Sequence, residues 1–106
     1  MLLVYKDEII KQIVQDYVNT DENLLAVILY GSVARGDFKP DSDIDLLLIT
    51  KNVKKTRKLF SDFREEVFTK TNVIISAVYV TPEMYNDPKN PLMRRIKAEG
   101  MVLWKK

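Results

Sequence analysis

The sequence predicts an α/β fold in which helices pack against a small mixed β-sheet. Three runs of mostly apolar residues have the length and composition of buried strands, at residues 24–30, 44–49 and 73–80. Around them, apolar residues recur at intervals of three and four, as on a helix with one buried face. The predicted order is helix, strand, strand, helix, strand, helix, helix and a short final strand, with the helices mainly on one face of the sheet.

The first half of the chain predicts a helix followed by two neighbouring strands. Residues 6–19 carry apolar side chains at helical spacing, namely Ile10, Ile13, Val14 and Tyr17. The run 24–30 ends at Gly31, and the run 44–49 follows a segment, 36–42, that is rich in turn-forming residues. We therefore expect two buried strands that lie side by side and are joined by a short excursion.

The middle of the chain predicts a long helix and a third strand. Residues 53–68 are amphipathic, and Asn52 is placed to cap them. The apolar stripe of this helix, which we expect to be core, consists of Val53, Thr56, Phe60, Phe63 and Val67. Residues 73–80 are dense in β-branched types and predict a third, central strand.

The last part of the chain predicts two short helices and an edge strand. Thr81 and Asn90 are each followed by a proline, which is the usual arrangement of an N-cap and a first helical residue. Gly100 ends the second of these helices, which covers residues 92–99. Residues 101–104 are apolar and predict a short edge strand.

Composition limits the classes of function. The 106 residues are 46% hydrophobic and 30% charged, which is typical of a folded protein, and the length suits one domain over 1–106. A net charge of +2 does not favour nucleic acid or an anionic membrane as a partner. With no Cys and no His, a metal site must use carboxylate and backbone oxygens, which suit Mg²⁺, Mn²⁺ or Ca²⁺. No apolar run approaches the ~20 residues of a membrane span, so we expect a cytoplasmic protein.

Two acids on the second predicted strand are the clearest functional signal. Asp43 and Asp45 are two residues apart, so both side chains point to one face, about 6 to 7 Å apart along the strand. Two bare carboxylates at that distance repel by roughly 2.5 kcal/mol at an effective dielectric of about 20. A divalent cation between them reverses this cost, and the spacing suits shared ligands of a two-metal phosphoryl-transfer centre. The pair predicts a metal site.

The end of the first predicted strand has the residues of a phosphate-binding corner. Gly31 lets a phosphate approach the backbone, and free N–H groups where a helix begins at Ser32 bind its charge. Arg35 is one turn further on and is explained equally well as a phosphate contact or as a structural ion pair. Taken alone, Gly31 and Ser32 are also explained as a turn and a helix cap, and Asp41 as a turn former.

Taken together, these residues resemble the signature of the DNA polymerase beta superfamily. That signature is a hydrophobic-Gly-Ser element, here Leu29-Tyr30-Gly31-Ser32, followed about ten residues later by an Asp-hydrophobic-Asp on the next strand, here Asp43-Ile44-Asp45. The fuller runs Gly-Ser-Val-Ala-Arg-Gly and Asp-Ser-Asp-Ile-Asp-Leu are similar to the minimal nucleotidyltransferase branch. The core of the resemblance covers residues 27–49, and the order of elements extends it to the whole chain.

The resemblance implies a polymerase-beta-like palm that moves a nucleoside monophosphate, AMP from ATP, to an acceptor. It implies that Asp43 and Asp45 are catalytic and hold Mg²⁺, and that Gly31, Ser32 and Arg35 bind the nucleotide. Minimal nucleotidyltransferases of this kind pair with HEPN toxins as antitoxins, and some add AMP to a tyrosine of the partner. A HEPN-type protein partner is therefore expected, and the oligomeric state is left open.

One feature departs from the family pattern. The family usually has a third carboxylate on a later strand, and the matching position here is Ser76, a poor magnesium ligand and a weak base. One hypothesis is that Glu66, Glu83, a partner's acid or the substrate's own phosphates replace it. The alternative is a catalytically weak or inactive antitoxin that neutralises its partner by binding.

Overall fold

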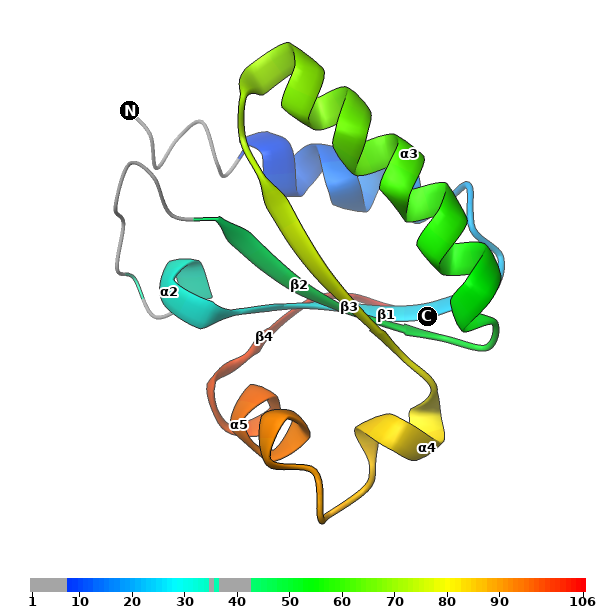
Figure 1. Cartoon of the computed structure of the whole chain (residues 1–106), viewed down its shortest axis with the longest axis vertical. Helices are drawn as coiled ribbons and strands as arrows, with labels where there is room; N and C mark the ends of the chain where they lie inside the picture. Colours follow the sequence, from blue (N-terminus) through cyan, green and yellow to red (C-terminus); the bar gives the residue numbers. More distant parts are fainter. Residues whose placement is uncertain (1–7, 35, 37–42) are drawn as a thin grey trace.

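The chain forms a four-stranded sheet with helices on both faces (Figure 1). The computed structural model describes residues 8–34, 36 and 43–106. Residues 8–12 are α-helical and continue into the π-helical turn η1 (Ile13–Tyr17). The remaining elements are β1 (Leu24–Tyr30), α2 (Gly31–Ala34), β2 (Ile44–Thr50), α3 (Val53–Thr71), β3 (Ile75–Val80), α4 (Pro82–Tyr85), α5 (Pro91–Glu99) and β4 (Met101–Lys105). Within the described ranges, no helix combines the length and the apolar character needed to span a bilayer.

The sheet has the strand order β3-β2-β1-β4 and is mixed, as predicted. β1 pairs antiparallel with β2 and with β4, whereas β2 pairs parallel with β3. The expectation that 73–80 is a central strand is wrong, because β3 lies at one edge and β4 at the other. β-branched residues fit any pleated, half-buried surface, so they do not report where in the sheet a strand lies.

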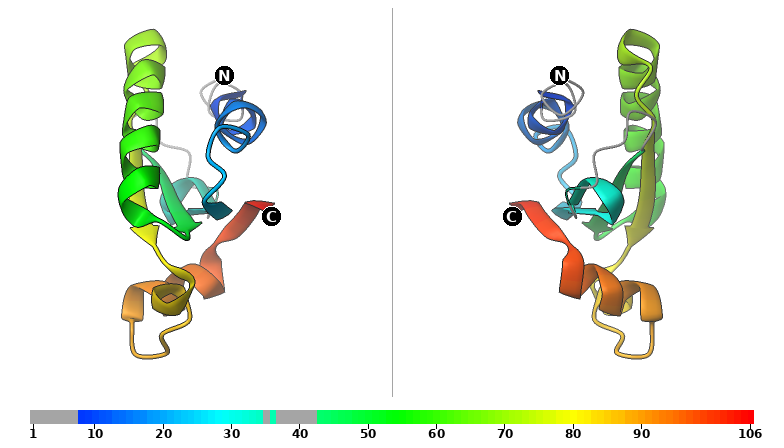
Figure 2. Two further views of the ribbon diagram at one scale, coloured as in Figure 1. Left: turned by 90° about the vertical axis from the view of Figure 1, so that its right-hand side faces the viewer. Right: turned by 90° about the vertical axis from the view of Figure 1, so that its left-hand side faces the viewer.

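Side chains of the strands alternate between two hydrophobic clusters, one on each face. On the first face, Ile44, Leu46 and Leu48 pack under η1 and α3. On the second face, Leu47 and Ile49 pack with residues of α5. Figure 2 shows the two helical layers on either side of the sheet. The longer helices are on one face as predicted, but α4 and α5 also cover part of the other, which differs from the prediction.

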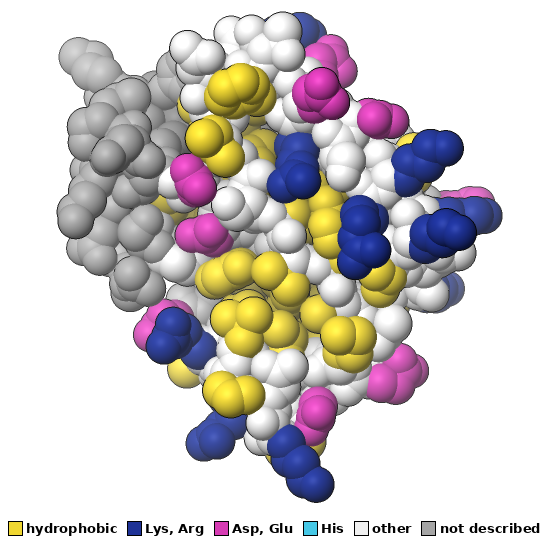
Figure 3. Space-filling model, viewed as in Figure 1, with side chains coloured by type: hydrophobic (Ala, Val, Ile, Leu, Met, Phe, Trp, Pro, Cys, Tyr) yellow, Lys and Arg dark blue, Asp and Glu magenta, His cyan; other side chains and the backbone are white. Residues whose placement is uncertain are grey.

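The residues that were predicted to begin helices act as N-caps. The Asn52 side chain accepts a hydrogen bond from the Lys55 backbone, Thr81 accepts from Met84, and Asn90 accepts from two backbone N–H groups of α5. The apolar stripe of α3 is core, since its central ring, Phe60, is fully buried. Basic side chains gather over α3 (Figure 3), and those at its start are exposed, namely Lys51, Lys54, Lys55, Arg57 and Lys58.

A buried polar network ties the segment before β1 to α3. The Asp21 carboxylate is 2% exposed and accepts hydrogen bonds from the Tyr17 hydroxyl at 2.8 Å, the Thr56 hydroxyl at 2.7 Å and the Asn23 backbone N–H at 3.1 Å. Burial, followed by the hydrogen bond to Asp21, raises the pKa of Tyr17, so its hydroxyl remains a donor at neutral pH. The carboxylate therefore satisfies three donors that have little access to water.

We expect Asp21→Ala to lower the free energy of unfolding by about 2–4 kcal/mol, because it leaves buried hydrogen-bond donors without an acceptor. The matched control is Asp16→Ala, which removes an exposed carboxylate from η1 and should change the free energy by less than about 0.5 kcal/mol. Urea denaturation followed by circular dichroism measures both. Equal effects of the two substitutions would contradict a stabilising role of the network.

Candidate active site

The two predicted acids lie where β2 begins, on the face opposite α3. Asp43 directly precedes β2 and Asp45 is its second residue, and both side chains are partly exposed. Ile44, between them, is fully buried in the cluster under η1 and α3. Because side chains alternate along a strand, the two carboxylates share the other face, as the sequence predicted.

Asp45 lies in a row of polar side chains that crosses three strands. It is opposite Tyr30 of β1 in the antiparallel pair and level with Ser76 of β3 in the parallel pair. Burial, and then the negative charge of Asp45, raise the pKa of Tyr30, so the phenol is protonated at neutral pH. From the sequence, Tyr30 was expected only to be the last apolar residue of the first strand. Only the register of β1 against β2, together with side-chain alternation, places it beside the acids.

Gly31 lets Asp45 lie directly against the corner between β1 and α2. Its φ of +78° is in the left-handed region, which disfavours residues with a Cβ. A Cβ added at Gly31 would clash with Oδ2 of Asp45 and lie 3.1 Å from its Cγ. The absence of a side chain at this position thus leaves room for the carboxylate. The predicted juxtaposition of the glycine corner and the acid is present.

Two other predicted site residues are described only in part or not at all. Ser32 follows Gly31 in α2, and the structure describes its backbone but not its side chain. Arg35 and Asp41 lie outside the described residues. The phosphate-binding roles of Ser32 and Arg35 therefore stay predictions.

Ser76 occupies the place where a third carboxylate was expected. It is the second residue of β3, and its hydroxyl donates a hydrogen bond of 3.2 Å to Oδ2 of Asp43. Glu66 does not replace the acid, because α3 packs on the opposite face and Glu66 pairs with Lys70 at 2.8 Å. Glu83 is in α4, beyond the far end of β3, and the four residue steps from Ser76 to Val80 already span about 13 Å.

The donor set fits a hard divalent cation. Asp43 and Asp45 offer carboxylate oxygens, the ligands that Mg²⁺ prefers, and Gly31 leaves the backbone beside them open to a phosphate. Among the described residues, these two acids are not joined by a third acid, His or Cys into a metal-binding group. Mg²⁺ is commonly held by one or two carboxylates together with substrate phosphates, so the pair is sufficient for a nucleotide-bound ion.

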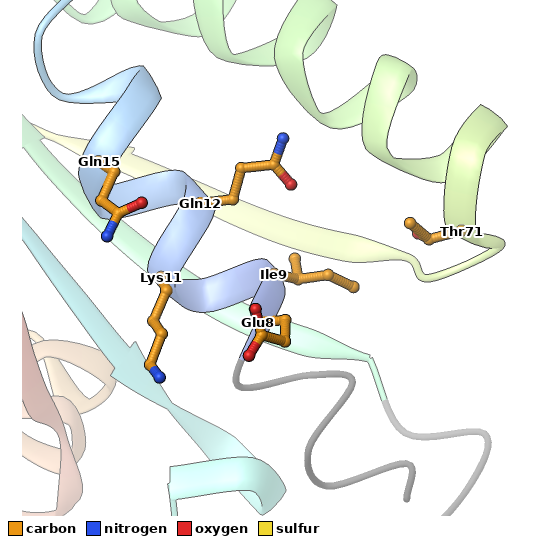
Figure 4. Close-up of a pocket in the computed structure, with 6 residues that line it drawn as sticks. All are labelled: Glu8, Ile9, Lys11, Gln12, Gln15 and Thr71. Atoms are coloured by element: carbon orange, nitrogen blue, oxygen red, sulfur yellow. The ribbon is translucent and has the colours of Figure 1, made fainter.

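A separate pocket of about 520 Å³ lies away from these acids. Its lining comes from the first helix and the end of α3 (Figure 4), namely Glu8, Ile9, Lys11, Gln12, Gln15 and Thr71. The side chains of Gln12 and Thr71 lie on opposite walls of this gap. This pocket is not the candidate metal site, because its lining includes a single carboxylate, that of Glu8. It also lies on the face of the sheet covered by η1 and α3, whereas the carboxylate pair lies at the start of β2, on the other face.

Two relatives in sequence are candidate protein adenylyltransferases. The chain is 35% identical to one candidate protein adenylyltransferase of Methanocaldococcus jannaschii, over 78% of this chain and 60% of the relative. It is 33% identical to a second candidate protein adenylyltransferase of the same organism, over 74% of this chain and 76% of the relative. The chain thus spans less than two thirds of the length of the first relative.

Solved structures with the same fold include nucleotidyltransferases and toxin-antitoxin proteins. A toxin-antitoxin structure with AMP-PNP superposes with a TM-score of 0.69 at 15% identity, covering 92% of this chain and 73% of that chain. A candidate nucleotidyltransferase from Sulfolobus solfataricus gives 0.67 at 22% identity, covering 99% and 85%. A structure of tri-AMPylated Shewanella oneidensis HEPN toxin in complex with MNT antitoxin gives 0.54 at 14% identity, covering 100% and 74%. At these identities the likeness establishes the fold.

The sequence as a whole carries the family assignment. Residues 10–106 match the family described as Polymerase beta, Nucleotidyltransferase, and this range includes both the glycine corner and the two acids. The fold, the position of Asp45 against Gly31 and the two archaeal relatives are consistent with that match. This chain belongs to the polymerase beta nucleotidyltransferase family.

Proposed function

We propose that this chain transfers AMP from ATP to a hydroxyl group of a partner protein. The observation that carries the proposal is the Asp45 carboxylate against the Gly31 corner, with Asp43 beside it on the same face. Family membership supports the reaction class, and the names of the two archaeal relatives support adenylyl as the group and a protein as the acceptor. The proposal keeps the cytoplasm as the expected location of the reaction.

Each site residue has a distinct task in this proposal. Asp43 and Asp45 would hold Mg²⁺ together with the phosphates of the donor. Bound there, Mg²⁺ neutralises phosphate charge and polarises the phosphoryl oxygens. Gly31 allows the triphosphate to approach the backbone, because no Cβ blocks it. Ser32 and Arg35 keep the phosphate-binding roles predicted from the sequence.

The transfer is an in-line displacement at the α-phosphorus. The acceptor oxygen forms a bond to this phosphorus, the bond to the bridging oxygen of the β-phosphate breaks, and pyrophosphate leaves with the electron pair. The hydroxyl proton passes to water, because β3 offers the neutral Ser76 hydroxyl where a carboxylate base was expected. The products are the adenylylated acceptor and pyrophosphate, so atoms and charge balance.

We assign the acceptor to a HEPN-type toxin, with this chain as its antitoxin. The support is the likeness in fold to the MNT antitoxin that is bound to a tri-AMPylated HEPN toxin. A structure of the same fold with AMP-PNP supports an adenine nucleotide as the donor.

A second candidate function is neutralisation of the partner by binding alone. The observation that favours it is Ser76, which gives the centre a hydroxyl where the reaction would use a carboxylate. In that case the acids bind a nucleotide or an ion without transferring AMP.

Mass spectrometry of the partner separates the two functions. We would incubate the protein with ATP, Mg²⁺ and a candidate HEPN-type partner protein, and then weigh the partner. An AMP increment that disappears with EDTA and with Asp45→Asn supports the transferase. A stable complex whose partner keeps its mass after prolonged incubation would contradict transfer and support neutralisation by binding.

A further inference from the structure

The side chain of Ser76 lies within the candidate site. It is level with Asp45 in the parallel register of β2 and β3, and its hydroxyl donates to Oδ2 of Asp43 at 3.2 Å. It therefore touches one acid and neighbours the other. A donated hydrogen bond fixes the direction of a carboxylate without adding negative charge to the centre.

The carboxylates of the described site indicate how many cations it holds beside a bound triphosphate. Asp43 and Asp45 are joined by no third acid, His or Cys among the described residues. A second ion about 4 Å from the first would need a further protein ligand on the attacking side of the reaction, since the triphosphate supplies oxygens on the leaving side. One Mg²⁺ needs only one or two carboxylates together with substrate phosphates. The described ligand set thus matches one ion.

We propose that Ser76 restricts this centre to one divalent cation per bound triphosphate and acts as a positioning residue for Asp43. The inference rests on the proposed function, because the ion is counted in the nucleotide complex. In two-metal enzymes the second ion activates the attacking oxygen, so a one-ion centre depends on an acceptor whose hydroxyl is activated elsewhere. The residue at position 76 then determines how many metal ions take part in the reaction.

Counting Mn²⁺ in the nucleotide complex tests this inference. The probe is Mn²⁺ with α,β-methylene ATP, an analogue in which the bond between the α-phosphorus and the bridging group is not cleaved. The analogue is present at the same concentration as the protein. Because the analogue alone also binds Mn²⁺, equilibrium dialysis first measures its uptake by the protein, and the paramagnetic resonance signal of free Mn²⁺ then gives the number of ions bound per complex. We expect one ion in the unmodified protein, one in Ser76→Ala and two in Ser76→Asp.

The affinities give a second readout of the positioning role. Ser76→Ala should weaken Mn²⁺ binding by roughly 3- to 10-fold, because loss of an outer hydrogen bond leaves the Asp43 carboxylate free to turn. Val78→Ala is the matched control, since it shortens a side chain on the same strand and face without touching the acids. It should leave both the ion count and the affinity unchanged.

The outcomes separate this inference from the proposed function. Two ions in the unmodified protein with the analogue bound would overturn the one-ion inference and leave nucleotide transfer standing. No uptake of the analogue with Mn²⁺ would overturn the proposed function and this inference together. One ion in the unmodified protein supports the one-ion count, and one ion in a folded Ser76→Asp variant would overturn the role of Ser76 in setting it. Where Ser76→Asp fails to fold, the weaker Mn²⁺ binding expected of Ser76→Ala tests the role of Ser76.

Discussion

Replacing Asp45 by Asn is expected to reduce Mg²⁺-dependent AMP transfer by a factor of roughly 10²–10³ or more, without unfolding the protein. The carboxamide keeps the shape of the side chain, so it still fits against Gly31. It loses the negative charge that binds a hard cation and gains an N–H₂ group that repels it. The substitution also relieves repulsion between Asp43 and Asp45, which offsets part of any stability that is lost with the carboxylate.

Initial rates of AMP transfer, together with thermal unfolding curves, test this expectation. Asp62→Asn is the matched control, because Asp62 is an exposed acid on α3, on the other side of the sheet. It should leave the transfer rate and the melting temperature unchanged. Full activity of Asp45→Asn would exclude the carboxylate as a metal ligand. A large drop in its melting temperature would instead assign it a structural role.

Gly31→Ala is expected to destabilise the protein by about 1–3 kcal/mol and to abolish nucleotide binding. The backbone φ of +78° is unfavourable for alanine, which accounts for about 1–2 kcal/mol. The added methyl group also clashes with Oδ2 of Asp45, so the carboxylate must turn away from the corner. The free energy of unfolding and the affinity for nucleotide should therefore both fall, because the added methyl group affects both.

Gly36 provides the control for the backbone part of this effect. Its φ of +82° is nearly the same as that of Gly31, but an added Cβ would meet no heavy atom of the described residues within 4 Å. Gly36→Ala should thus cost only the backbone strain and should leave Asp45 in place. Urea denaturation measures the cost of each variant, and fluorescence titration with a labelled ATP analogue measures binding. Equal binding losses in the two variants would contradict the account of Gly31.

Much of the fold follows from local sequence. The run 24–30 became β1 with the predicted bounds, because an uninterrupted apolar run is stable only when both faces of a strand are buried. Asn52, Thr81 and Asn90 cap their helices, since a cap is a hydrogen bond within a few residues of one chain segment. Signals of this kind need no knowledge of the tertiary structure.

The parts that the sequence did not predict depend on contacts between distant segments. β3 lies at an edge of the sheet because, among the described strands, it pairs only with β2. Its β-branched composition does not indicate how many neighbours it has. α5 covers the second face because Met93 and Ile96 pack on the strands, although its polarity resembles that of a surface helix. Likewise, Tyr30 enters the site only through its register with Asp45.

The candidate site was predictable where its geometry is local. Asp43 and Asp45 share a face because of strand alternation, and Gly31 meets Asp45 because the strands are neighbours with a fixed register. The position of Ser76 followed from the family pattern, and its hydrogen bond to Asp43 is a result of the parallel register. The roles of Ser32 and Arg35 stay predictions, because they depend on side chains beyond the described part of the chain.

Calorimetric titration with ATP tests most directly whether the acids and the glycine corner form one nucleotide site. With Mg²⁺ present, we predict that one ATP binds per chain. The heat should vanish with EDTA and in the double variant Asp43→Asn and Asp45→Asn, while Asp62→Asn binds as the unmodified protein does. Binding that is equally tight without Mg²⁺, or that survives in the double variant, would contradict the account.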